Sequence, residues 1–135
     1  VAESCSGGLI TSSIIKVSGV SKIFSFGIIT YSNKSKVKYL SVSKKTLRKF
    51  GAVSSNVANE MIEGLYKKEK TRITVSTTGI AGPRGGTKNK PVGLVFIGIK
   101  YKNKNFIYKK LFKGSRLDVQ NKTKNFIFKK INELI

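Results

Sequence analysis

The chain has 135 residues, the size of one ordinary domain with its own core. Its 27 lysines and arginines outnumber 6 acids, and the net charge of +21 predicts non-specific attraction to polyanions rather than a particular fold. The lysines are dispersed, which favours a solvated surface over a dedicated nucleic-acid site. The sequence contains no histidine, which excludes Ser-His-Asp and Cys-His catalysis and histidine metal sites.

Cysteine usage and hydropathy give expectations about location. The single cysteine, Cys5, excludes an internal disulfide and fits a reducing compartment. No signal peptide is visible, and no apolar run reaches the about 18 residues that span a bilayer. We therefore expect a cytoplasmic protein that does not enter a membrane.

Apolar periodicity predicts the secondary structure of the first third of the chain. We expect a helix over Ser6–Ser18, with Gly19 as its C-terminal cap. The β-branched and aromatic run Ile23–Thr30 predicts a buried strand. The polar segment Tyr31–Lys36 that follows is typical of a turn.

The middle of the chain predicts two helices, a strand and a loop. Ser43 is a plausible N-cap for a short helix that ends at Phe50, before Gly51. A longer amphipathic helix is expected over Val57–Lys70. The strand Ile73–Thr78 then runs into a glycine-rich loop that ends at Pro91.

Two adjacent strands and a helix complete the chain. Val92–Lys100 and Asn105–Phe112 predict a hairpin, and a closing helix is expected from about Leu117. Helices and strands alternate until this pair of strands, so we expect a single domain over residues 1–135 of the α/β class with a mixed β-sheet.

Three polar clusters in the sequence can carry chemistry. Glu3–Gly8 (ESCSGG) is either a nucleophile beside free N–H groups at a helix N-terminus or a helix cap of small residues. Tyr31–Lys36 holds a tyrosine and a lysine, either of which can replace histidine as a base, or is a solvated loop. Thr77–Thr87 is either a loop whose backbone approaches a ligand closely or a plain loop, and it matches neither a Walker loop nor a dinucleotide fingerprint.

Taken in order, these clusters and two further segments resemble the CinA C-terminal domain family, which includes stand-alone nicotinamide-nucleotide amidohydrolases of the PncC type. The matching segments are AESCSGG (2–8), YSNKSK (31–36), GAVSSNVANEMIEG (51–64), TGIAGPRGGTKNKPVG (78–93) and KGSR (113–116). The resemblance implies a three-layer α/β/α sandwich around a mixed sheet. It also implies a hydrolase of pyridine nucleotide metabolism that converts nicotinamide mononucleotide and water to nicotinic acid mononucleotide and ammonia, with no metal and no other cofactor.

The resemblance groups Ser4, Tyr31 and Lys36 as catalytic residues. We infer that Ser4 attacks the amide carbon and that Lys36, aided by Tyr31, takes its proton. Cys5 is the rival nucleophile. We expect the oxyanion and the substrate to be bound by residues of the first and third clusters and by a late arginine: Cys5, Ser6, Gly7, Gly8, Thr78, Gly79, Gly82, Arg84, Gly85, Gly86, Thr87 and Arg116.

The chain also departs from the family pattern. Family members carry about twenty residues before the ESC motif, a helix and a first strand of the size of one αβ unit, whereas here only Val1 and Ala2 precede it, so we expect a truncated domain. Gln120 stands where the family often has arginine.

Two alternatives to an active enzyme follow from these features. One is a catalytically inactive remnant that keeps the fold. The other is a basic nucleic-acid-associated accessory protein, for which Tyr101, Phe106 and Tyr108 are the candidate stacking residues. The expected partner is a small pyridine nucleotide, with nucleic acid bound only non-specifically through charge and homodimerisation left open.

Overall fold

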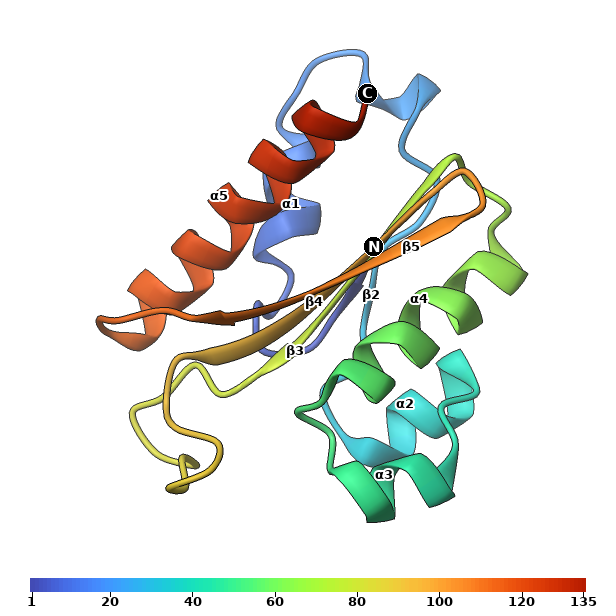
Figure 1. Ribbon diagram of the computed structural model, residues 1–135. Helices are drawn as coiled ribbons and strands as arrows, with labels where there is room; N and C mark the ends of the chain where they lie inside the picture. Colours follow the sequence, from blue (N-terminus) through green and yellow to red (C-terminus); the bar gives the residue numbers. More distant parts are fainter.

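The computed structural model, which describes residues 1–135, has a five-stranded sheet between two layers of helices (Figure 1). The strand order is β2-β1-β3-β4-β5. The first three strands in this order run parallel, and β4 and β5 form an antiparallel hairpin. Their bounds are β1 Ala2–Glu3, β2 Ile28–Ile29, β3 Ile73–Gly79, β4 Leu94–Tyr101 and β5 Lys104–Leu111. The expected α/β/α sandwich with a mixed sheet is confirmed.

The helices divide between the two faces of the sheet (Figure 1). One face carries α1 (Leu9–Ile15) and α5 (Arg116–Leu134), and the other carries α2 (Asn33–Leu40), α3 (Lys44–Phe50) and α4 (Ser55–Lys68). A short 3-10 helix, η1 (Val20–Lys22), follows α1. Each layer encloses its own hydrophobic cluster, so the sheet is buried on both faces.

Serine side chains determine where four of the helices begin. Ser32, Ser43, Ser54 and Ser115 each accept a hydrogen bond from an N–H group in the first turn of the helix that follows. At the start of α5, Asp118 completes a reciprocal capping box. The expected helices α3, α4 and α5 and the β4–β5 hairpin are confirmed with small shifts at their ends.

The predicted strand Ile23–Thr30 is wrong over its first half. Only Ile28 and Ile29 form β2, and the side chain of Ile23 is 83% exposed. The physical reason lies in the pairing: β1 is two residues long and, on the β2 side, pairs only with Ile28 and Ile29, so no strand lies beside residues 23–26 to hold them in a ladder.

The predicted turn Tyr31–Lys36 is also wrong, because α2 begins inside it. Ser32 and Asn33 have the residue types of a turn, but Ser32 instead caps a helix that starts at Asn33. The first helix starts at Leu9, three residues later than expected, since Gly7 and Gly8 have φ angles of 61° and 95° and belong to a tight turn.

Candidate active site

The carboxyl ends of three neighbouring parallel strands meet at one edge of the sheet. Ser4 directly follows β1, Thr30 directly follows β2, and Thr77 lies near the end of β3. Parallel strands point their carboxyl ends toward the same edge, where open α/β sheets bind their ligands. The three polar clusters of the sequence are thereby brought to one place.

Lys36 lies against Ser4 in this place. The first turn of α2 brings Lys36 inward, where only 1% of the residue is exposed. Its Nζ atom is 3.0 Å from Ser4 Oγ, 2.7 Å from the carbonyl oxygen of Thr30 and 3.1 Å from that of Tyr31. Burial lowers the pKa of Lys36 from its ordinary 10.5 to about 8. The site therefore holds a hydroxyl in contact with an amine that loses its proton at about pH 8, well below the pKa of an ordinary lysine.

Tyr31 contacts Lys36 through its backbone rather than through its phenol. The Tyr31 side chain is exposed, and its hydroxyl lies 3.3 Å from Nη2 of Arg116. The other terminal nitrogen of Arg116 donates to the carbonyl oxygen of Gly82 at 2.7 Å. Arg116 thus joins the second polar cluster to the glycine-rich loop.

Glu3 occupies the N-terminus of α1. Its carboxylate is fully buried and accepts hydrogen bonds from the N–H groups of Gly8, Ile10 and Thr11 at 2.9, 3.2 and 2.7 Å. A carboxylate at a helix N-terminus is stabilised by the free N–H groups and by the helix dipole. Glu3 therefore fixes α1 against the end of β1, directly before Ser4.

The same hydrogen bonds determine which amides remain free near Ser4. The N–H group of Gly7 donates to the Ser4 carbonyl at 3.1 Å, and that of Gly8 donates to Glu3. The N–H groups of Cys5 and Ser6 have no hydrogen-bond partner in the chain. These two amides are free to bind an anion beside the Ser4 hydroxyl.

Thr77 connects β3 to the turn that holds Ser4. Its hydroxyl oxygen accepts a hydrogen bond from the N–H of Ser4 at 3.3 Å and lies 2.7 Å from the hydroxyl oxygen of Ser6. The Ser6 side chain is thereby held by Thr77, and the turn around Ser4 is fixed from two sides.

Cys5 is a poor nucleophile in this environment. Its side chain is buried, and burial raises the pKa of its thiol to about 12. Its carbonyl oxygen accepts a hydrogen bond from the Gln120 side chain at 2.9 Å. At neutral pH Cys5 is a thiol rather than a thiolate.

A cavity of about 200 Å³ lies beside the Ser4 turn. It is lined by residues of all three clusters and by the start of α5: Cys5, Tyr31, Gly79, Ile80, Ala81, Gly82, Arg84, Gly85 and Arg116. Of the other residues expected to bind substrate, Thr78 donates its hydroxyl to the Ala52 carbonyl, and Gly86 and Thr87 lie on the exposed outer part of the loop.

Sequence reasoning missed three residues that support this site. In the sequence Glu3 belongs to a motif without a role of its own, Thr77 belongs to a predicted strand and to the third polar cluster without a partner, and Gln120 is only a departure from the family pattern. An acid four residues before a pair of glycines is a signal that could have indicated an anchored helix start, but nothing in the sequence spacing pairs Thr77 with Ser6 or Gln120 with Cys5.

The aromatic residues proposed for nucleic-acid stacking are engaged in packing. The ring of Tyr108 lies 5.3 Å from that of Phe126 in an edge-to-face contact, and Phe106 is only partly exposed. Arg72 donates to the hydroxyl of Tyr101. These rings do not form an open platform for bases.

None of the helices combines the length and apolar character needed to cross a membrane.

The comparison with protein families decides which family this architecture represents. The family model described as the CinA C-terminal domain matches residues 1–135, the whole chain. The chain belongs to the CinA C-terminal domain family. The resemblance inferred from the sequence motifs is therefore confirmed.

Individual relatives agree with this assignment. A CinA-like protein of Fusobacterium nucleatum is 56% identical over 115 residues, which are 85% of this chain and 28% of that protein. A CinA-like protein of Kosmotoga olearia is 53% identical over 120 residues, 89% of this chain and 29% of that protein. The chain thus spans less than a third of the length of these curated relatives.

Solved structures share the fold over nearly the whole chain. The competence/damage inducible protein CihA from Agrobacterium tumefaciens superposes with a TM-score of 0.94 and 35% identity, over 98% of this chain and 82% of that chain. A CinA superfamily protein from Escherichia coli gives a TM-score of 0.95 and 30% identity, over 99% of this chain and 78% of that one.

Proposed function

We propose that the chain is a serine-type amidohydrolase that uses Lys36 as its base and deamidates the carboxamide of a pyridine nucleotide, nicotinamide mononucleotide. The observation that carries the proposal is the buried contact of 3.0 Å between Lys36 Nζ and Ser4 Oγ. The family resemblance supplies the substrate class. The chemistry of the site is consistent with this substrate class.

The surroundings of Lys36 orient a neutral amine for proton abstraction. A neutral lysine has two N–H donors and one lone pair. The carbonyl oxygens of Thr30 and Tyr31 accept two hydrogen bonds from Nζ at 2.7 and 3.1 Å, so the lone pair of the neutral amine points at the Ser4 hydroxyl. Because burial lowers the pKa of Lys36 to about 8, a substantial fraction is neutral near physiological pH.

Acylation follows from this geometry. Ser4 Oγ forms a bond to the amide carbon of the substrate while its proton moves to Lys36 Nζ. The negative charge that develops on the carbonyl oxygen is stabilised by the free N–H groups of Cys5 and Ser6. Lys36 then gives its proton to the amide nitrogen, the C–N bond breaks, and ammonia leaves an ester on Ser4.

Hydrolysis of the ester completes the cycle. Neutral Lys36 takes a proton from a water molecule, whose oxygen attacks the ester carbon, and the same two amides stabilise the second oxyanion. Lys36 returns the proton to Ser4 Oγ as the acid is released. No step requires a group other than the substrate, water and this chain's own residues.

The cavity size suggests how a nucleotide would lie. The cavity beside Cys5 has a volume of about 200 Å³, smaller than the about 300–1,000 Å³ of typical small-molecule pockets. It therefore suits the pyridine ring with its carboxamide group, and not a whole nucleotide. The ribose phosphate would extend over the exposed glycine-rich loop, where Arg84 has no hydrogen-bond partner in the chain. Arg116 is already engaged by Gly82, so Arg84 is the better phosphate partner.

Ammonia release from nicotinamide mononucleotide tests the proposal. We expect release by the purified chain, loss of release in Ser4→Ala, and a covalent adduct on Ser4 when the intact protein is weighed during turnover. Release that is absent from the chain, or equal in Ser4→Ala, contradicts the proposal. If the chain releases no ammonia, the alternative of a catalytically inactive remnant that keeps the fold is favoured.

A further inference from the structure

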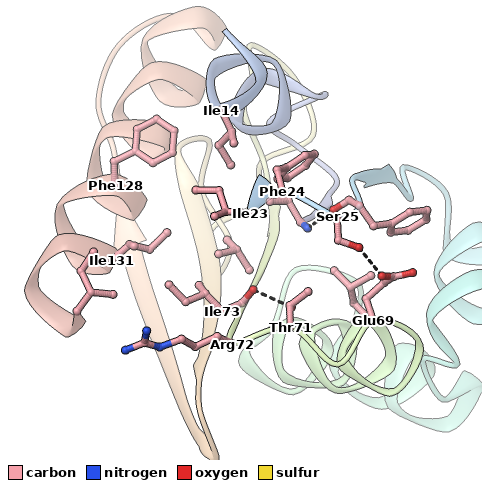
Figure 2. Close-up of a pocket in the computed structure, with 15 residues that line it drawn as sticks. Ile14, Ile23, Phe24, Ser25, Glu69, Thr71, Arg72, Ile73, Phe128 and Ile131 are labelled. Atoms are coloured by element: carbon pink, nitrogen blue, oxygen red, sulfur yellow. Dashed lines mark hydrogen bonds between the residues drawn. The ribbon is translucent and has the colours of Figure 1, made fainter. Parts of the chain in front are cut away.

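Two further cavities share no lining residue with the cavity beside Cys5, and they differ in chemistry. The larger has a volume of about 590 Å³, and Figure 2 shows Phe128 and Ile131 of α5 along it. Eleven of its fifteen lining residues are hydrophobic. The other is a groove of about 470 Å³ between α2 and α3, and only two of its seven lining residues are hydrophobic. The α2–α3 groove is therefore the one that can select a charged ligand.

Four cations line the α2–α3 groove, two from each helix. Lys34 and Lys38 are four residues apart on α2, and Lys44 and Arg48 are four residues apart on α3. Residues four apart lie on the same face of a helix, so each helix presents a pair of like charges to the groove. Like charges in this spacing repel each other and destabilise the helix that carries them.

No carboxylate neutralises these four side chains. Of the two ion pairs in the chain, one joins α4 to β4 and the other lies at the end of α5. Glu60 of α4 reaches the start of α3, but its carboxylate accepts hydrogen bonds from the N–H of Ser43 and the hydroxyl of Thr46. All four cations of the groove are exposed. The groove thus holds four positive charges without a counter-charge.

Two of the cations lie at the unfavourable ends of their helices. Lys34 is in the first turn of α2 and Lys44 is in the first turn of α3, and neither turn contains an acid. The helix dipole is positive at this end, so it repels a cation and attracts an anion. An anion bound in the groove would relieve the repulsion within each pair and the repulsion between these lysines and the helix ends.

The floor of the groove is apolar. Leu47 belongs to the hydrophobic cluster under α2, α3 and α4, and Val37 packs against the same cluster. Both residues line the groove, one from each helix. Isolated phosphate ions gain nothing from such a floor, whereas the face of a planar ring can cover it. The volume of about 470 Å³ also falls within the about 300–1,000 Å³ of typical small-molecule pockets.

We propose that the α2–α3 groove binds a small organic polyphosphate of the nucleoside di- or triphosphate class. The phosphates lie between the two pairs of cations, and the ring lies on Val37 and Leu47. A nucleic-acid strand suits the groove less well, because no aromatic side chain lines it for base stacking. The two helices are also short, with eight and seven residues, or about 12 Å at 1.5 Å per residue.

The groove and the candidate active site use different sides of α2. Lys36 is buried and contacts Ser4, whereas Lys34 and Lys38 are exposed in the groove. Binding in the groove is measured without turnover, so the proposal stands whether or not Ser4 is catalytic.

Titration calorimetry of the whole chain tests the proposal, with adenosine triphosphate, inorganic tripolyphosphate and inorganic phosphate as probes. The salt concentration is kept at about 0.15 M, where charges more than about 8 Å apart are screened. We expect saturable binding of adenosine triphosphate at one site, at least about 10-fold tighter than that of tripolyphosphate, because only the nucleotide covers the apolar floor. Inorganic phosphate should bind more weakly than either.

A pair of double variants locates the site. Lys34→Gln with Lys44→Gln removes one cation from each helix, and we expect it to weaken adenosine triphosphate binding by at least about 10-fold. The folded chain should tolerate this change, since it removes cations from the positive ends of two helices. The control, Lys109→Gln with Lys129→Gln, removes the same charge from exposed positions on β5 and α5, outside the groove, and should leave the affinity unchanged.

Four results overturn the proposal. The first is the absence of saturable binding of adenosine triphosphate. The second is an equal loss of affinity in the two double variants, which assigns the binding to net charge alone. The third is tripolyphosphate binding as tight as that of the nucleotide, which removes the role of the floor. The fourth is displacement of the nucleotide by a short single-stranded oligonucleotide that binds more tightly, which assigns the groove to nucleic acid.

Discussion

The Nζ atom of Lys36 lies 3.0 Å from the Oγ atom of Ser4, and this contact joins the first turn of α2 to the end of β1. Ser4 is 7% exposed and Lys36 is 1% exposed, so the pair is shielded from bulk water, and the cavity that Cys5 and Tyr31 line lies next to it in the chain. An amine in such a position is a base only when it is neutral. Its protonation therefore controls the proposed reaction.

The pH dependence of turnover is the first consequence. Because burial lowers the pKa of Lys36 to about 8, kcat/KM for nicotinamide mononucleotide should rise with pH through an apparent pKa near 8 and then level off. Stopped-time ammonia assays between about pH 6.5 and 9.5 measure this profile. A profile that is flat over this range excludes Lys36 as the base.

The identity of the nucleophile is the second prediction. Ser4→Ala should lower kcat by at least about 1,000-fold, since the attacking oxygen is removed. Cys5→Ala should change kcat by less than about 3-fold, because the buried thiol has a pKa of about 12 and stays protonated. The opposite pattern, with activity lost in Cys5→Ala and kept in Ser4→Ala, makes Cys5 the nucleophile.

Several helices and strands of the fold can be predicted from the sequence, because their ends depend on residues that are close together in the chain. Ser43 before an apolar-periodic segment and Gly51 after it were enough to predict α3, because capping depends on neighbouring residues only. The β4–β5 hairpin is predictable because its two strands are neighbours in the sequence and are joined by a short connection. The pairing of Ser4 with Lys36 was inferred from the family resemblance and not from spacing.

The parts that could not be predicted depend on contacts between distant residues. Whether Ile23 lies in a strand depends on a neighbouring strand, and β1 is too short to supply one. The start of α2 at Asn33 could be confused with a turn because Ser32 suits both. The role of Glu3 depends on the path that brings α1 back over the end of β1.

The buried position of Lys36 also makes folding stability depend on pH. Its pKa is about 8 in the folded chain and 10.5 when exposed, so between these values the unfolded chain binds more protons than the folded one. The free energy of unfolding should therefore rise with pH across this window, by up to about 3 kcal/mol.

This third prediction is measured by urea unfolding at several pH values, in comparison with Lys36→Met. The raised pKa of Cys5 acts in the opposite direction above about pH 9, because the unfolded chain then loses a proton that the folded chain keeps. Both proteins should therefore carry Cys5→Ala. Parallel stability curves for the two proteins would refute the lowered pKa of Lys36.

The anchoring of α1 gives a fourth prediction. Glu3→Gln replaces an acceptor of three N–H groups by an amide whose own NH₂ group must lie beside them. We expect a loss of about 2 kcal/mol in the free energy of unfolding, as for other buried hydrogen-bonded charges. The control Glu133→Gln removes an exposed ion pair with Lys130 and should change the free energy of unfolding far less, because solvent screens that pair. Equal effects of the two substitutions would contradict the role assigned to Glu3.

The packing of α4 against α2 gives the last prediction. A Cβ atom added at Gly64 would lie 1.7 Å from the carbonyl oxygen of Leu40, the last residue of α2. Replacing glycine by alanine inside a helix ordinarily stabilises it by about 1 kcal/mol. Here α4 and α2 must instead move apart, so Gly64→Ala should lower the free energy of unfolding by at least about 2 kcal/mol.

Because α2 carries Lys36, the same shift should reach the candidate active site. We expect Gly64→Ala to lower kcat as well as stability, measured below the melting temperature so that the chain is folded during the assay. Lys67→Ala, at an exposed position in the last turn of α4, should alter neither quantity appreciably and serves as the control. Unchanged turnover in a destabilised Gly64→Ala protein would show that the Ser4–Lys36 contact does not depend on how closely α2 packs against α4.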